Sequence, residues 1–243
     1  MNFLKNHPFE VAAHFNRSIV LTFAFPKAEL ERFIPEPLTL DTFQNEWAFF
    51  AIALVDTSAL RPKAFPGLLG NDFFLIGYRI FVRYRNLKGR NLRGLYILKS
   101  ETNKKKMEWV GNFFTHYNYS TVDISLIEQG SKLSFASETS GLKIEMDVSP
   151  KTKEIPFGSP FKDWADARKF AGPLPHTFTC DKEKKSVLII EGVREHWTHE
   201  PLKVENYIVD YFDQIGLKNP ILASAFRIDN TPYYWKKGRL EKW

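Results

Sequence analysis

The sequence is poor in cysteine. Cys180 is the one cysteine among 243 residues, so the chain cannot form an internal disulfide or a cysteine-based metal cluster. Its context, Phe-Thr-Cys, is typical of a strand, and we interpret the thiol as a small core residue rather than a nucleophile. This cysteine usage fits a reducing compartment, so we expect a cytoplasmic location.

Long apolar runs and an export signal are also missing. The longest uncharged apolar run, WAFFAIALV at 47–55, is about half the length of a membrane-spanning helix. The first residues, MNFLKNHPFEVAAHF, lack the basic-then-apolar layout of a signal peptide. We therefore expect no membrane partner.

The common phosphate and nucleophile motifs are absent as well. The sequence contains no Gly-rich phosphate loop, no nucleophile elbow and no dinucleotide fingerprint. It also contains no internal repeat and no Gly/Ser-rich linker. We expect no cofactor, and we interpret residues 1–243 as a single domain.

Aromatic residues are abundant: they make up 15% of the chain, with 22 Phe, and 44% of all residues are hydrophobic. Strand signals lie at 17–25, 47–57, 73–85, 94–99, 115–127, 131–138, 142–148 and 186–198, and near 220–228 and 232–239. Helices are predicted at 27–34, 102–114, 160–170 and 203–215. Strands that follow strands favour a mainly β (α+β) fold, with an antiparallel barrel-like sheet and a few short flanking helices.

Two motifs suggest other kinds of site, for a metal ion and for nucleic acid. The HWTH segment at 196–199 carries two histidines three residues apart, which a strand would point to opposite faces, so we expect no metal site. Arg79, Arg83 and Arg85 share a strand face with Phe81, and this basic and aromatic pattern, with a net charge of +6, is the best candidate for nucleic-acid binding. The opposite face of that strand is apolar, which favours arginines that face solvent or a partner subunit over nucleic-acid contacts.

The stretch KKKMEWVGNFFTHYNYS at 104–120 combines lysines, aromatics and a histidine. Lys104, Lys105 and Lys106 fall in the first turns of the predicted helix, where solvent screens them, so we interpret them as a solvated face and not as a Schiff-base nucleophile.

From Thr115 the pattern has period two, and one face is polar at its start and apolar at its end, like the mouth and floor of a pocket. That face holds His116, Asn118, Ser120, Val122, Ile124 and Leu126. His116 is either a site residue or a satisfied histidine at a strand end. Arg17 heads the apolar face of the 17–25 strand, where it either anchors an anion or extends to solvent.

Five motifs carry a family resemblance: FNRS at 15–18, ELERFIPEPLTLD at 29–41, FFAIALVDTSAL at 49–60, HWTHEPL at 196–202 and ILASAFRID at 221–229. In this order they resemble the acetoacetate decarboxylase superfamily, and more closely its uncharacterised branch, the domain of unknown function 2071. The resemblance implies an antiparallel cone or barrel with a buried pocket. In the decarboxylases that pocket holds an adjacent lysine pair, one of which forms the Schiff base.

Matched to that pattern, Arg17 falls on the active-site arginine, and Thr115 and His116 fall, within one position, on the lysine pair. The pocket glutamate maps onto Phe50. Because neither threonine nor histidine can form an iminium, the resemblance implies the fold and the pocket without the decarboxylase chemistry.

We therefore expect a pocket for a small carboxylate or carbonyl metabolite, formed by Arg17, Phe50, Thr115, His116, Asn118 and Ser120. Arg17 would anchor the anion and His116 would act as hydrogen-bond donor or general acid/base. If the protein is an enzyme, a lyase- or hydrolase-type reaction on a small keto or carboxylic acid is expected. The first alternative is a non-catalytic binding or sensing module, and the second is a nucleic-acid binder with a basic surface. Formation of a homo-oligomer is possible.

Overall fold

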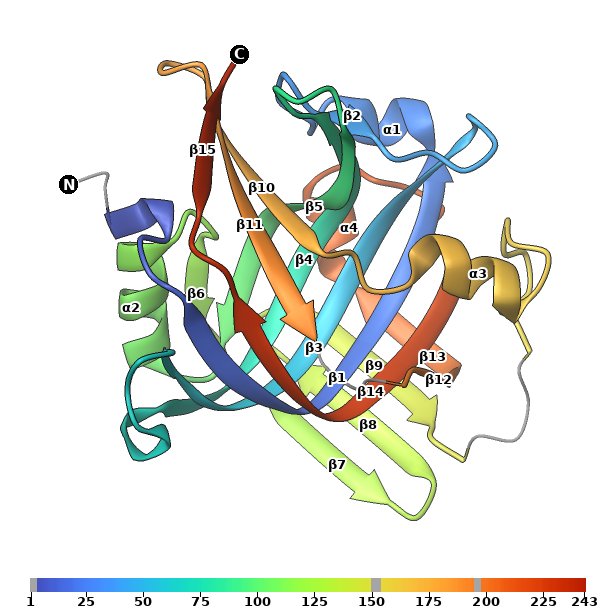
Figure 1. Ribbon diagram of the computed structural model, residues 1–243. Helices are drawn as coiled ribbons and strands as arrows, with labels where there is room; N and C mark the ends of the chain where they lie inside the picture. Colours follow the sequence, from blue (N-terminus) through green and yellow to red (C-terminus); the bar gives the residue numbers. More distant parts are fainter. Residues whose placement is uncertain (1–3, 150–153, 195–197) are drawn as a thin grey trace.

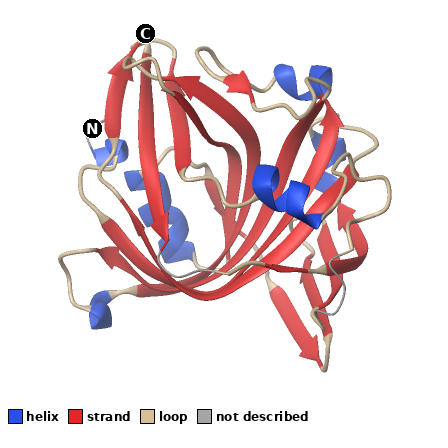
Figure 2. Ribbon diagram, turned by 45° about the vertical axis from the view of Figure 1, so that its right-hand side comes forward, coloured by secondary structure: helices blue, strands red, loops and turns tan. Residues whose placement is uncertain are grey.

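The computed structural model describes residues 4–149, 154–194 and 198–243. Strands make up most of it, and helices are few and short (Figure 2). The strands are β1 (Val11–Pro26), β2 (Thr39–Leu40), β3 (Trp47–Pro62), β4 (Asn71–Arg85), β5 (Asn91–Thr102), β6 (Tyr119–Thr121), β7 (Ser125–Gln129), β8 (Lys132–Ser137), β9 (Leu142–Asp147), β10 (His176–Asp181), β11 (Ser186–Arg194), β12 (Glu200–Pro201), β13 (Lys203–Val209), β14 (Ile221–Trp235) and β15 (Arg239–Lys242). The helices are η1 (Leu4–Asn6), α1 (Lys27–Glu31), η2 (Gly67–Leu69), α2 (Lys105–Phe114), α3 (Trp164–Ala171) and α4 (Asp210–Gln214).

The largest sheet has eleven strands and closes on itself (Figure 1). Its main path runs β12-β14-β1-β3-β4-β5-β10-β11-β15, and β11 also pairs with β14, which completes a ring. The pairings are antiparallel except those of β5 with β10 and with β6. The structure therefore confirms the predicted β-rich, barrel-like fold, with a mixed sheet in place of a wholly antiparallel one.

A second, four-stranded sheet, in the order β13-β9-β8-β7, packs against one face of the ring. The apolar face of β1 points into this interface, as does the apolar face of β4. The side chains buried there include Ile19, Leu21, Phe23, Phe25, Phe50, Ile52, Tyr78, Ile80, Phe135 and Ile144. The face that the sequence marks as the most hydrophobic is thus the core between the two sheets.

The opposite face of the ring strands turns inward and is closed at one end by α3. Asp163 caps this helix, because its side chain accepts a hydrogen bond from the backbone N–H of Asp166. Phe161 stacks on Phe49 of β3, with ring centroids 5.2 Å apart. Further along β3 the same face carries small residues such as Ala51, which leaves space inside the ring.

Several predicted elements differ in the structure: for example, one strand, β14, covers most of the two strands predicted near 220–228 and 232–239. Residues 203–215 are not one helix: β13 comes first and α4 follows. The predicted strand at 115–127 is interrupted, because β6 begins at Tyr119 and Asn118 has a positive φ of 53°. The helix predicted at 160–170 begins at Trp164, and Asp163 is its cap. No helix among the described residues is long and apolar enough to cross a membrane.

Candidate functional site

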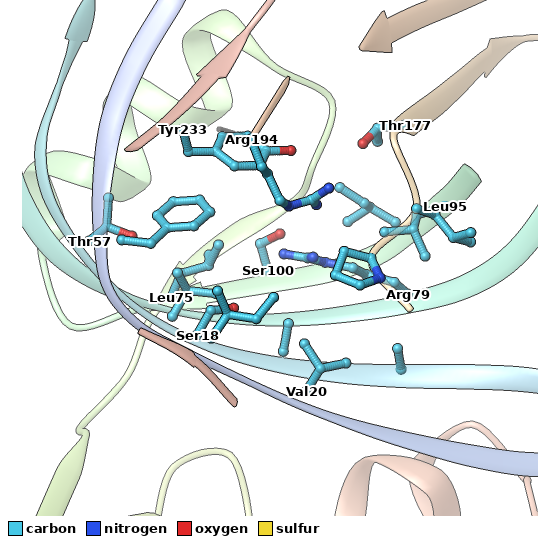
Figure 3. Close-up of a pocket in the computed structure, with 18 of the residues that line it drawn as sticks. Ser18, Val20, Thr57, Leu75, Arg79, Leu95, Ser100, Thr177, Arg194 and Tyr233 are labelled. Carbon is cyan, nitrogen blue, oxygen red and sulfur yellow. The ribbon is translucent and has the colours of Figure 1, made fainter. Parts of the chain in front are cut away.

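A cavity of about 140 Å³ lies inside the ring, on the face of the sheet away from the second sheet (Figure 3). Its walls come from β1, β3, β4, β5, β11 and β14, from α2 and the residues after it, and from the segment that follows α3. The polar side chains that line it are Ser18, Thr57, Arg79, Ser100, Tyr117, Tyr119, Thr177, Arg194, Thr231 and Tyr233. Apolar residues make up the remainder, so a small number of polar groups face an apolar enclosure, as is typical of small-molecule sites.

Arg79 is the most deeply enclosed cation of the cavity. Its side chain projects from β4, and its Nε is buried without a hydrogen-bond partner among the described residues. Burial lowers the pKa of Arg79 below its ordinary value, the hydroxyls of Tyr233 and Tyr119 oppose this, and the positive charge of Arg194 adds to it. An arginine keeps its proton even so. Arg79 therefore presents its positive charge to the cavity without a carboxylate partner among the described residues.

Arg194, at the end of β11, supplies the second positive charge. Its Cζ lies 4.9 Å from the centre of the Tyr233 ring, a cation–π geometry. Figure 3 shows that the guanidinium groups of Arg79 and Arg194 point into the same space, beside Ser100. Among the described lining residues, these two arginines are the charged groups, and no carboxylate accompanies them.

Two glycines make room for these side chains. A Cβ at Gly77 would lie 2.7 Å from Nε and 2.8 Å from Nη2 of Arg79, so the guanidinium lies directly over the bare backbone of β4. A Cβ at Gly192 would lie 1.8 Å from the Tyr233 hydroxyl. A side chain at either glycine would displace the polar group that it meets, so both glycines leave room for a polar group of the cavity.

Neutral hydroxyls complete the polar set. Burial raises the pKa of Tyr119 to about 12, although the nearby Arg79 lowers it. Burial also raises the pKa of Tyr117, while a hydrogen bond with Thr177 lowers it. Both phenols are therefore protonated donors at neutral pH. The hydroxyl of Thr57 is buried without a hydrogen-bond partner among the described residues.

The lysines lie elsewhere. No lysine is among the described residues that line the cavity. Lys99 on β5 turns to the other face of the sheet, because β5 carries a bulge opposite Tyr78 and Arg79. Its Nζ lies 2.5 Å from Oε1 of Glu101 and 5.5 Å from the Tyr78 ring centre. Lys104, Lys105 and Lys106 are exposed, as the sequence predicts.

The structure places Arg17 outside the cavity. Its Nη1 donates to Oε2 of Glu128 at 3.0 Å, and its Nε lies 3.7 Å from Oδ1 of Asp229. These contacts lie on the face of β1 that turns toward the second sheet, so Arg17 is already paired with two carboxylates. Phe50 lies on the corresponding face of β3, fully buried, with its ring centroid 5.1 Å from that of Phe212.

Three other residues singled out in the sequence, Thr115, His116 and Asn118, share a separate recess with Lys5 and Cys180. Burial lowers the pKa of His116, and the charge of Lys5 lowers it further. Burial raises the pKa of the Cys180 thiol to about 12, so this thiol is not a nucleophile at neutral pH. Ser120 lines neither the recess nor the cavity. In the structure, therefore, neither Arg17 nor Ser120 lies in the recess that contains His116.

The basic strand at 73–85 does not form the outward-facing stripe that its sequence suggests. Arg79 points into the cavity, and Arg83 bonds to buried Asp41, with Nε 2.5 Å from Oδ1. Arg93 holds the other oxygen of Asp41, also at 2.5 Å. In the HWTH segment, residues 196 and 197 lie outside the described residues; within the described part of the chain, no group of three potential metal ligands comes together.

The family of the chain follows from its sequence. A family profile described as "uncharacterized conserved protein", the domain of unknown function 2071, matches residues 12–229. This match covers most of the 243 residues. The chain belongs to this family. No curated protein matches the sequence.

Several solved structures have a fold similar to that of this chain. An acetoacetate decarboxylase-like enzyme from Sphingomonas wittichii RW1 has a TM-score of 0.61 at 9% identity, over 98% of this chain and 95% of that one. The enduracididine biosynthesis enzyme MppR complexed with pyruvate has a TM-score of 0.59 at 10% identity, over 94% and 90%. Acetoacetate decarboxylase from Legionella pneumophila subsp. pneumophila str. Philadelphia 1 has a TM-score of 0.57 at 12% identity, over 95% and 87%. The fold is therefore that of acetoacetate decarboxylase-like proteins.

Proposed function

We propose that this member of the family is a single-domain protein that binds a small carboxylate or oxo acid inside the ring. In this proposal Arg79 and Arg194 hold the carboxylate, and hydroxyls such as those of Ser100 and Tyr119 bond the remaining polar groups of the ligand. The observation that carries the proposal is the pair of enclosed guanidinium groups with no carboxylate partner among the described residues.

The electrostatics of the cavity favour an anion. Removing a charge from water costs several kcal/mol, by order of magnitude, and a cation that meets no counter-charge regains little of this cost. Arg79 and Arg194 also repel each other, which adds to the cost of the ligand-free state. A carboxylate satisfies the planar fork of a guanidinium with two parallel hydrogen bonds, so it would relieve the desolvation and the repulsion together.

The titration properties of the same groups favour binding over acid–base or Schiff-base catalysis. A general base works best when its pKa lies near the working pH. The titratable groups among the described lining residues are arginines, which stay charged, and tyrosines, of which Tyr117 and Tyr119 have a pKa above the ordinary value. A Schiff base needs a buried neutral amine, and the lysine nearest to the cavity along β5, Lys99, is paired with Glu101.

The structural neighbours agree with the ligand class. One of the similar proteins, MppR, was crystallised with pyruvate, and again with a condensation product of pyruvate and imidazole 4-carboxaldehyde. Pyruvate has six heavy atoms, and a cavity of about 150 Å³ can hold a six-atom ligand such as benzene. The cavity of about 140 Å³ is therefore large enough for an acid of this size.

Calorimetric titration with pyruvate and butanoate tests the proposal. We expect both acids to bind the wild-type protein, and we expect Arg79→Met and Arg194→Met each to weaken binding by roughly 30-fold or more, since loss of a buried charge partner costs about 2–5 kcal/mol. Butanamide, which has the same size and no charge, should bind at least tenfold more weakly than butanoate.

Arg17→Met and His116→Gln serve as matched controls, because these residues lie outside the cavity. Both variants should bind the acids as the wild type does. Equal affinity in the wild type and in both cavity arginine variants would refute the proposal. So would a covalent pyruvate adduct that borohydride traps on a lysine.

A further inference from the structure

A second cavity, of about 180 Å³, adjoins the first. It lies between the N-terminal segment, α2 and the ends of β3 and β14. Its apolar wall includes Phe9, Val11, Pro62, Val110 and Phe114. The Phe9 and Phe114 rings meet edge to face, with centroids 5.7 Å apart. This second cavity is thus lined mainly by hydrocarbon, whereas the first contains the two cationic groups.

The polar groups of the second cavity are mostly engaged elsewhere. Arg61 uses its Nε on the carbonyl of Phe65 at 2.9 Å and its Nη1 on the carbonyl of Ala59 at 2.8 Å. The hydroxyl of Thr115 donates to the carbonyl of Gly111 at 2.7 Å. His7 leaves one buried nitrogen, Nδ1, without a hydrogen-bond partner among the described residues. Arg61 is the one arginine among the described residues that line this cavity, and two of its three guanidinium nitrogens are thus bonded to backbone carbonyls.

The two cavities share part of their lining. Leu60, Met107, Tyr117, Tyr119 and Trp235 line both of them. Met107, on α2, is buried and lines both spaces. Its unbranched side chain has three rotatable bonds and adapts to irregular spaces at small cost. Met107 is therefore an adaptable side chain at the boundary of the cationic and the apolar cavity.

From this arrangement, and resting on the function proposed above, we propose that the ligand is a carboxylic acid with an apolar tail. The carboxylate lies on Arg79 and Arg194, the chain passes Met107, and the tail occupies the space between Val110 and Trp235. The ligand class is medium-chain aliphatic or arylalkyl carboxylates, rather than the shortest oxo acids that the first cavity alone would hold.

The volumes set the length of the tail. A cavity of about 150 Å³ holds roughly six heavy atoms, so butanoate or pyruvate fills the first cavity. A further 180 Å³ holds a similar number of atoms. An acid of about eight to ten carbons therefore occupies both spaces, and a longer one must extend into solvent.

Calorimetric titration of the wild-type protein with butanoate, hexanoate, octanoate, decanoate and dodecanoate tests this inference. Complete burial of a methylene strengthens binding about fourfold. We expect the Kd to fall by a factor of two to four per methylene up to octanoate or decanoate, and to level off beyond. Octan-1-ol, which has the tail without the charge, should bind at least tenfold more weakly than octanoate.

Val110 provides the matched variants, because it lines the second cavity and not the first. Val110→Phe should weaken octanoate at least tenfold and leave butanoate within twofold of the wild type. Val110→Ala, which enlarges the space, should move the plateau to longer acids. Lys106→Phe adds the same ring to the exposed side of α2 and should change neither affinity.

The outcomes separate this inference from the proposed function. A Kd that stays constant from butanoate to octanoate, while Arg79→Met still abolishes butanoate binding, would overturn the tail inference and leave the proposed function standing. Failure of every acid to bind would refute the proposed function itself. The wild-type series decides the question even if Val110→Phe does not fold.

Discussion

At the scale of single residues, the position of the Arg79 guanidinium depends on the lack of a side chain at Gly77. Gly77 and Arg79 are two residues apart on β4 and share the inward face, so a strand places them side by side. The guanidinium lies over Gly77 at a distance that no Cβ would permit. The glycine therefore fixes where the positive charge sits in the cavity.

Gly77→Ala should displace the guanidinium and weaken carboxylate binding by roughly tenfold. The backbone of a strand tolerates alanine, so the free energy of unfolding should change by less than about 1 kcal/mol. Titration with butanoate and urea unfolding measure the two effects. Gly67→Ala is the control, since a Cβ at Gly67 would meet nothing within 4 Å. Unchanged affinity in Gly77→Ala would show that Arg79 does not need this position.

The residues that line the cavity differ from those that the sequence favours as a site, for a physical reason. Apolar alternation marks Ile19 and Tyr78 as interior, and they are interior, but the interior they share is the core between two sheets. The cavity lies on the other face of β4, where Arg79 lies between Leu75 and Phe81. A mixed polar and apolar face on a strand whose other face is fully apolar is the signal that would have identified Arg79.

At the scale of elements, β5 serves both interiors with adjacent residues. Ser100 faces the cavity, and Glu101, which is 1% exposed, faces the second sheet. Glu101 accepts hydrogen bonds from the hydroxyls of Tyr78, at 3.0 Å, and Ser140, at 2.8 Å, and pairs with Lys99. Because Ser140 lies in the turn between β8 and β9, this carboxylate ties the second sheet to the ring.

Glu101→Ala should lower the free energy of unfolding by about 3 kcal/mol, because it leaves buried hydroxyls and the ammonium of Lys99 without their acceptor. Glu145→Ala removes a carboxylate from an exposed pair with Lys143 and should cost less than about 1 kcal/mol. Urea unfolding of the two variants gives the comparison. Equal losses would mean that Glu101 does not join the two sheets.

The sequence predicts most helices and strands. Its predictions fail where tertiary contacts determine the secondary structure. The strands predicted at 17–25, 47–57 and 73–85 are confirmed as parts of β1, β3 and β4, because alternation with β-branched residues specifies a strand locally. Residues 203–209 are a strand because they pair with β9, a contact that no local pattern reveals. Residues 115–118 form a turn because α2 ends at Phe114 and the chain must return to pair with β5.

At the scale of the whole molecule, the fold has two interiors with different chemistry. The space between the sheets is filled with aromatic and aliphatic side chains and specifies the fold, whereas the inside of the ring carries two arginines that have no carboxylate partner among the described residues. The sequence could predict the β-rich fold, because alternation and aromatic content are local properties. It could not predict that Arg79 and Arg194 line one cavity, because only ring closure between β11 and β14 brings Arg194 near Arg79.

Three histidines in separate parts of the molecule, the buried His7 and His199 and the half-buried His116, should give the whole fold a pH dependence. Burial is the largest cause in each case, and it lowers the pKa below the ordinary value of 6.5. The folded state therefore binds protons more weakly than the unfolded state. Stability is fully present above about pH 7 and is lost as the pH falls through the unfolded pKa, when the unfolded chain takes up protons first.

We expect the free energy of unfolding, measured in urea, to be constant between pH 7.5 and 8.5 and to decline from about pH 7 to pH 5. His7→Gln, His116→Gln and His199→Gln should each make this decline shallower, and the triple variant should be nearly flat, because glutamine takes up no proton. Arg17→Met, which alters no histidine, should retain the wild-type slope. A decline of the same steepness in the triple variant would assign the pH dependence to other groups.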